Sequence, residues 1–204
     1  MYDTINTEIL SCAEMKNMKL KKCNALLSLL SFTSMLLHIG YSAFAYFTLY
    51  YNPGLTRIFS APFFILTCLH AVTGMCSVFF LSDGTRGNLY PKKNISTIVQ
   101  RLTAALIFPL LILHLNTFDL LQSSSSGGKP VYFILLLLSE VLFYAVIVTH
   151  AAVSFSKALI TLGVLCSEKA RKITDRIIYI LCAVFLAAAS FSIIKGQITM
   201  LWHF

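Results

Sequence analysis

The sequence predicts an all-α integral membrane protein, a single bundle of five transmembrane helices. Of its 204 residues, 57% are hydrophobic and only 12% are charged, whereas a soluble globular domain contains about 25% charged residues. The apolar residues lie in runs that reach the roughly 20 residues needed to cross a bilayer core of about 30 Å. These runs do not alternate between apolar and polar residues, as the strands of a transmembrane β-barrel do.

Each expected span is bounded by a local signal, and together the spans form one transmembrane domain over residues 1–204. The first span follows Lys19, Lys21 and Lys22, and Asn52-Pro53-Gly54 predicts a turn after it. The segment Gln122–Gly128, rich in serine and glycine, predicts a flexible connector, and the cation-rich segment 163–176 predicts a loop. The expected spans are 24–50, 58–81, 98–121, 131–162 and 177–202.

The formal net charge of +8 comes mainly from cation clusters that flank the apolar runs. We interpret them as charges that set membrane topology rather than as a nucleic-acid surface. Lysine and arginine are frequent in the N-terminal segment and in the segments 82–97 and 163–176. The positive-inside rule therefore predicts a cytoplasmic N-terminus and, with five spans, an outside C-terminus. The expected location is the inner (cytoplasmic) membrane.

Four histidines fall one to a span in the first four expected spans: His38, His70, His114 and His150. Ionisable side chains are costly inside a bilayer and indicate function, although packing or an interhelical hydrogen bond explains one isolated histidine equally well. From a rise of about 1.5 Å per residue, His38 and His114 lie roughly 21 and 24 Å from the inner ends of their spans. His70 and His150 lie roughly 12 to 20 Å from the inner surface. Two histidine pairs at two depths are what two stacked bis-histidine haems require.

Haem is the expected cofactor, because imidazole is a good axial ligand and helical bundles hold cofactors on facing helices. A zinc or copper site would need three or four ligands at one depth, with carboxylates or thiolates among them. The sequence shows no such gathering. We therefore expect a five-helix bundle holding two b-type haems that transfer electrons and do not bind oxygen.

This arrangement resembles the cytochrome b membrane anchor of the succinate dehydrogenase and fumarate reductase family, in its single-chain, five-helix, two-haem form. The resemblance covers residues from about 24 to 202. The stretch Gln100-Arg-Leu-Thr-Ala104 before His114 is similar to the family's Arg, Thr, Gly element, with alanine in place of the usual glycine. The resemblance implies two pairs of haem-iron ligands, His38 with His114 at the distal haem and His70 with His150 at the proximal one.

The resemblance also implies partners and a substrate. A flavoprotein subunit and an iron–sulfur subunit would bind on the cytoplasmic side, and electrons would pass between them and a membrane quinone, expected to be menaquinone. The sequence has no flavin fingerprint and no iron–sulfur cysteine run, so the dicarboxylate chemistry would belong to the partners. This chain would contribute the quinone redox chemistry of the complex within the lipid bilayer.

Four further residues are candidates for the site. Haem propionates favour cations, and Arg57, Arg101 and Lys157 are positioned to bind them, although snorkelling to the interface explains each cation equally well. Glu140 is an intramembrane carboxylate about 15 Å outward of His150. It is a candidate to accept a proton from a quinol, and a polar cap or an interhelical hydrogen bond is an equal alternative.

Two other functions stay open at the level of sequence. A haem-free, proton-coupled transporter subunit would use intramembrane histidine and glutamate as a proton relay, although the chain has no inverted repeat of the kind transporters show. A di-haem cytochrome b could instead serve a hydrogenase or a formate dehydrogenase. Co-purifying subunits would distinguish that function from the favoured one.

Overall fold

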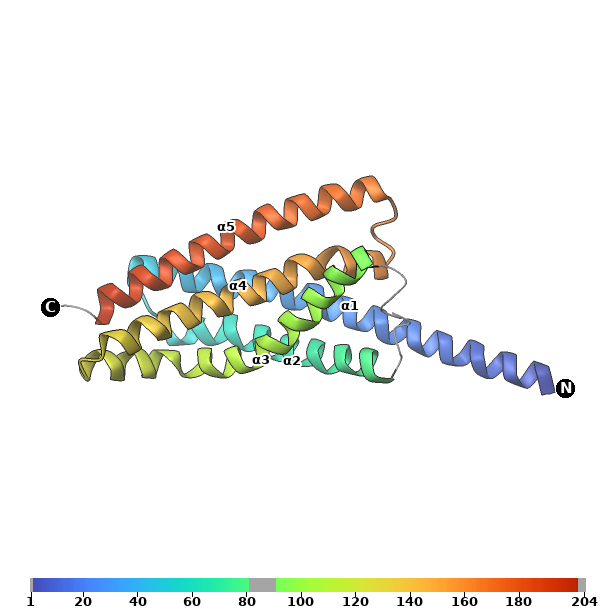
Figure 1. Cartoon of the computed structure of the whole chain (residues 1–204), viewed down its shortest axis with the longest axis horizontal. Helices are drawn as coiled ribbons and strands as arrows, with labels where there is room; N and C mark the ends of the chain where they lie inside the picture. The colour runs from blue at the N-terminus through green and yellow to red at the C-terminus, as the bar shows by residue number, and fades with distance from the viewer. Residues whose placement is uncertain (1, 81–90, 202–204) are drawn as a thin grey trace.

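The chain is all-helical in the computed structural model, which describes residues 2–80 and 91–201. The helices are α1 (Tyr2–Thr48), α2 (Pro53–Phe80), α3 (Pro91–Ser126), α4 (Pro130–Thr161) and α5 (Glu168–Leu201) (Figure 1). Among the described residues, five helices are long and apolar enough to span a membrane, as the sequence predicts. The end of the second expected span at residue 81 and the end of the fifth at residue 202 lie outside the described residues.

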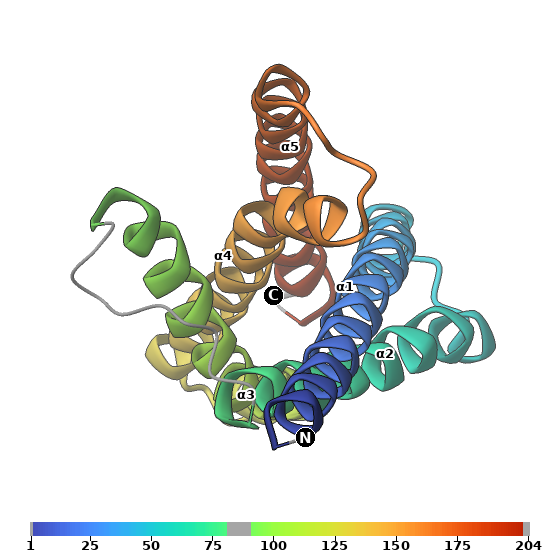
Figure 2. The ribbon, with the colours of Figure 1, turned by 90° about the vertical axis from the view of Figure 1, so that its right-hand side faces the viewer.

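α4 occupies the centre of the bundle, where it packs against α1, α3 and α5 (Figure 2). α1 packs in addition against α2 and α5. The main core is built around Phe143 and Ile147 of α4, with Met35 from α1 and Cys182 from α5. A smaller cluster joins α3 to α4 near the turn between them. α2 has α1 as its main packing partner, so much of its surface is open.

The predicted turn between the first two spans is present. α1 ends at Thr48, and Pro53 is the first residue of α2, a position where its missing N–H costs nothing. Asn52 caps α2: its Oδ1 accepts hydrogen bonds from the backbone N–H groups of Gly54 at 2.9 Å and Leu55 at 3.2 Å. The tight turn at Asn52 therefore fixes the relative direction of α1 and α2.

The predicted flexible connector at Gln122–Gly128 is wrong for most of its length, because α3 continues to Ser126. The serine hydroxyls donate to carbonyls one turn back, as Ser123 does to Leu120 at 3.0 Å and Ser126 to Gln122 at 2.8 Å. These bonds satisfy the hydroxyls without leaving the helix. The turn comes at Gly128, whose φ of 62° suits glycine.

The predicted loop at 163–176 is also wrong beyond Ser167, because α5 begins at Glu168. Lys172 pairs with Glu168 at 2.9 Å and Arg171 with Asp175 at 3.7 Å, both four residues apart along the helix. Such pairs stabilise a helix that is rich in charge. α1 also begins before the expected residue 24, at Tyr2, and its candidate membrane span is Met18–Thr48.

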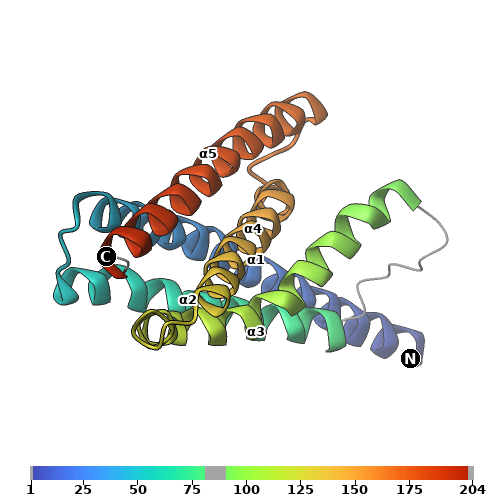
Figure 3. The ribbon, with the colours of Figure 1, turned by 60° about the vertical axis from the view of Figure 1, so that its left-hand side comes forward.

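α3 bends partway along its length, so that its first part diverges from α2 (Figure 3). Pro109 lies inside α3, and proline kinks a helix because it removes one backbone hydrogen bond and clashes with the preceding turn. Both parts of α3 still reach α4: Thr103 in the first part contacts His150, and Thr117 in the second contacts Glu140. The bend therefore allows α3 to meet α4 at two levels.

Candidate functional site

His70 of α2 and His150 of α4 face one another. Their ring centroids are 6.3 Å apart and their planes are inclined by 60°. An imidazole–metal bond is about 2 Å long, as zinc sites show. Two such bonds in line, together with the distance from each ring centroid to its nitrogen, add up to about the observed separation of the centroids. The spacing of the two rings therefore suits one metal ion held between them.

The His150 ring is held by α3. Its Nδ1 lies 3.1 Å from the Gln100 backbone oxygen and 3.1 Å from Thr103 Oγ1. A carbonyl oxygen only accepts, so Nδ1 carries the proton and Nε2 keeps its lone pair. Metal-binding histidines are oriented in this way by a hydrogen bond from the other ring nitrogen. Residues 100 and 103 belong to the stretch that the sequence analysis connected with His114, whereas the structure brings them to His150.

His38 and His70 each have a buried Nδ1 for which no hydrogen-bond partner is found among the described residues. The His38 ring stacks on Phe63 with centroids 5.7 Å apart, and the backbone of Asn24 interacts with the His70 ring. Buried nitrogens without partners are rare in native proteins and call for an explanation. Both rings have binding capacity that the described part of the chain does not use.

His38 of α1 and His114 of α3 line one cavity of about 360 Å³. Most of its wall is apolar, and the His114 ring stacks on Phe143 with centroids 4.9 Å apart. His70 and His150 are not part of this wall. The structure thus places the His70 ring near the His150 ring and puts His38 and His114 on one cavity wall, and their pairing as haem ligands stays a prediction. Polar side chains on the wall include Tyr46, Thr117, Glu140, Tyr144 and Gln197.

The helices that carry each pair are not packed directly against one another. Among the described residues, α4 packs against α1, α3 and α5, and α2 packs mainly against α1. Neither α1 with α3 nor α2 with α4 is among the closely packed helix pairs. A flat macrocycle between two histidines needs such a separation of the helices. The ring distance of 6.3 Å at His70 and His150 and the cavity shared by His38 and His114 are the observations that bear on a haem at each pair.

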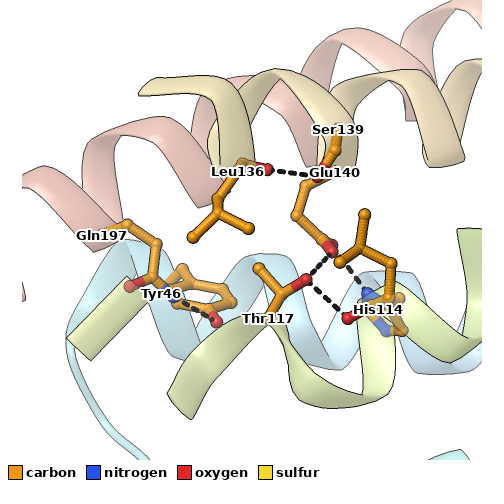
Figure 4. A network of polar contacts seen from close by, with 8 residues as sticks. Tyr46, His114, Thr117, Leu136, Ser139, Glu140 and Gln197 are labelled. Carbon is orange, nitrogen blue, oxygen red and sulfur yellow. Dashed lines mark hydrogen bonds and ion pairs between the residues drawn. The ribbon is translucent and has the colours of Figure 1, made fainter. Parts of the chain in front are cut away.

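Glu140 is the most deeply buried charged group of the site, with 1% of its surface exposed. Figure 4 shows it reaching from α4 toward α3, where Oε2 lies 2.7 Å from His114 Nδ1 and Oε1 lies 2.6 Å from Thr117 Oγ1. Both carboxylate oxygens therefore have polar partners. The interhelical hydrogen bond that the sequence left open as an alternative for Glu140 is thus present, although its partner His114 was not predicted.

Tyr46 and Gln197 form a second polar contact on the cavity wall (Figure 4). Gln197 Nε2 donates to Tyr46 Oη at 2.9 Å, and Gln197 Oε1 is buried with no partner found in the described part of the chain. Neither residue was predicted from the sequence. An amide in an apolar span next to Gly196 was the available signal for Gln197, because polar side chains inside membrane helices seek partners.

Gly196→Ala is expected to loosen the packing of α5 on α1. A Cβ at position 196 would overlap the Tyr46 ring, whereas a Cβ at Gly40 would meet nothing within 4 Å. Overpacking costs about 1–3 kcal/mol, so the unfolding midpoint of the detergent-solubilised protein should fall for Gly196→Ala. Gly40→Ala is the matched control. Equal midpoints for both variants would contradict the close approach of Tyr46 to α5.

The three candidate propionate partners lie in different places. Lys157 is half-buried, and its Nζ donates to Gln100 Oε1 at 2.8 Å, beside the ring of His150. Arg101 is exposed and close enough to Lys157 to interact with it electrostatically. Arg57 is exposed near the start of α2, next to Thr56 on the cavity wall. Lys157 and Arg101 are thus near the pair His70 and His150, and Arg57 is nearer the cavity of the other pair.

No family model, curated protein or solved structure matches the chain. In the described residues there is also no group of three or more histidine, cysteine, aspartate or glutamate side chains that could hold a metal ion by itself. Fold and site define a class: an all-helical protein with five helices apolar enough to span a membrane and two histidine pairs on its first four helices.

Proposed function

We propose that this chain is the di-haem cytochrome b membrane anchor of a succinate dehydrogenase or fumarate reductase complex. It carries electrons between a membrane quinone, menaquinone by expectation, and the iron–sulfur and flavoprotein subunits. The main support is the arrangement of the histidines: His70 faces His150 at a ring separation of 6.3 Å, and His38 and His114 share a cavity. These are the pairs that two stacked haems need.

Each side chain of the site then has a definite task. The paired histidines would hold the b haems, which would supply one-electron transfer. Gln100 and Thr103 orient the His150 ring through its Nδ1, and Lys157 and Arg101 offer cations to propionates beside that pair. Apolar side chains, such as Phe143 stacked on His114, line the cavity of the other pair.

The proposed orientation follows the cation distribution. The N-terminus lies in the cytoplasm and the C-terminus outside the inner membrane, by the positive-inside rule. The segments Arg86–Lys93, of which residues 86–90 lie outside the described residues, and Lys169–Arg176 would then face the cytoplasm and help to dock the two partner subunits. Attraction to anionic lipid headgroups accounts for the same charges.

A second candidate function is a haem-free, proton-coupled transporter subunit. The contact between Glu140 and His114 at 2.7 Å favours it, because paired ionisable groups inside a membrane are typical of proton relays. A di-haem cytochrome b that serves a hydrogenase or formate dehydrogenase is a third. It has the same histidine pairs but different co-purifying subunits.

The decisive test is the haem content of the detergent-purified protein. We expect a dithionite-reduced minus oxidised spectrum typical of b haems, and close to two haems per chain in a pyridine haemochrome assay. Well-folded protein without haem would overturn the proposal and favour the transporter. Two haems with a co-purifying hydrogenase subunit would retain the cytochrome and change its partner.

A further inference from the structure

Glu140 lies in an unusual setting for a carboxylate. It is 1% exposed, and it lies on α4 among buried apolar residues such as Leu137 and Phe143. Ionised groups in such surroundings are costly unless hydrogen bonds satisfy their oxygens. Here one oxygen contacts His114 Nδ1 at 2.7 Å and the other contacts Thr117 Oγ1 at 2.6 Å (Figure 4).

The contact fixes the chemistry of the His114 ring. A carboxylate oxygen only accepts, so His114 Nδ1 donates its proton to Glu140 and Nε2 keeps a free lone pair. The ring is also held in place by Phe143, with centroids 4.9 Å apart, and by the edge of Tyr144, with centroids 6.2 Å apart. Tyr144 interacts with the carboxylate as well. His114 is thus a pre-oriented ligand with Nε2 available.

Carboxylate partners of this kind change the properties of a metal ligand. A metal-binding histidine that donates its other N–H to a carboxylate is more basic than one that donates to a neutral group. A more basic imidazole stabilises ferric iron relative to ferrous iron, so it lowers the reduction potential of the haem that it holds.

The other three histidines lack such a partner among the described residues. His150 Nδ1 contacts the neutral oxygens of Gln100 and Thr103. The Nδ1 atoms of His38 and His70 are buried and have no hydrogen-bond partner in the described part of the chain. The carboxylate therefore distinguishes the pair His38 and His114 from the pair His70 and His150.

We propose that Glu140 is a positioning residue that acts through His114 and lowers the midpoint potential of the haem held by His38 and His114. This inference rests on the proposed function. It gives Glu140 a role that competes with proton acceptance from quinol, and the two roles make different predictions. The positioning role requires that the midpoint potential depend on Glu140. The role as proton acceptor requires only that quinone turnover depend on Glu140.

The test is a potentiometric titration of haem absorbance in the purified protein, with haem counted by pyridine haemochrome. Glu140→Gln keeps the size and an acceptor oxygen but removes the charge. We expect two haems per chain, one midpoint potential shifted upward, and the other unchanged. Ser139→Ala is the matched control: this hydroxyl donates to the Leu136 carbonyl at 2.7 Å on the same helix (Figure 4), and both midpoints should stay in place.

The possible outcomes separate the inference from the proposed function. Wild-type protein without haem would overturn the proposed function. Two haems with both midpoints unchanged in Glu140→Gln would overturn the inference alone, and slow quinone turnover in that variant would then assign Glu140 to proton acceptance.

Thr117→Val decides the question if Glu140→Gln does not fold or loses haem. This variant leaves the contact between Glu140 and His114 in place. It removes the Thr117 hydroxyl, which donates a hydrogen bond to the other oxygen of the same carboxylate. The carboxylate then interacts more strongly with the His114 N–H, so one midpoint potential should shift downward. A midpoint that stays unchanged or rises would overturn the inference.

Discussion

Replacing His70 by alanine is expected to remove one haem from the protein and to leave the other. His70 and His150 face one another at a ring separation of 6.3 Å, whereas His38 and His114 line a cavity to which the first pair does not contribute. Alanine offers no ligand, so under the proposed function one haem site would lose a ligand while the other would keep both. A pyridine haemochrome assay should fall from close to two haems per chain to close to one.

Double variants test whether the pairs are separate. The double variant of His70 and His150 should retain one haem, as each single variant does, because both changes affect one site. The double variant of His70 and His114 should retain none, because it removes one ligand from each pair. Loss of both haems from a single substitution would argue against separate pairing, provided that circular dichroism shows the helical content of the wild type.

The five-helix architecture was predictable because the length and apolarity of a membrane-compatible helix follow directly from bilayer thickness. The helix ends were less predictable. The serine run near the end of α3 has the composition of a linker, yet its hydroxyls bond back to carbonyls such as that of Leu120. The cations after Ser167 have the composition of a loop, yet pairs such as Lys172 with Glu168 support a helix. Composition does not distinguish these cases, because the deciding contacts are local and specific.

The sequence predicted how deep the candidate site residues lie in the membrane, but not which neighbouring helix each side chain contacts. Position along a helix estimates depth, and depth grouped His70 with His150, whose rings the structure places 6.3 Å apart; their role as haem ligands stays a prediction. One sequence does not show how each helix is rotated about its own axis, and this rotation decides which side chains meet. The contact of Glu140 with His114 depends on how α4 packs on α3. The contact of Tyr46 with Gln197, which are 151 residues apart, depends on how α1 packs on α5.

Cells that lack this chain are expected to release the flavoprotein and iron–sulfur subunits into the soluble fraction. The chain supplies five helices apolar enough to span a membrane, and under the proposed function the two partner subunits would carry the dicarboxylate chemistry and depend on these helices for attachment. Fractionation followed by activity assays should show succinate-dependent reduction of a soluble dye in the supernatant. Quinone reduction by succinate in the membranes should fall to background.

A chain that carries the double variant of His70 and His114 separates anchoring from electron transfer. Its apolar helices are unchanged, so the catalytic subunits should stay in the membrane fraction, but neither haem site keeps both ligands and quinone reduction should be lost. Membrane-bound flavoprotein without quinone reduction would support both parts of the proposed function. Full quinone reduction by this variant would mean that electrons reach the quinone without the histidine pairs, and unchanged membrane attachment in cells without the chain would assign the anchor to another subunit.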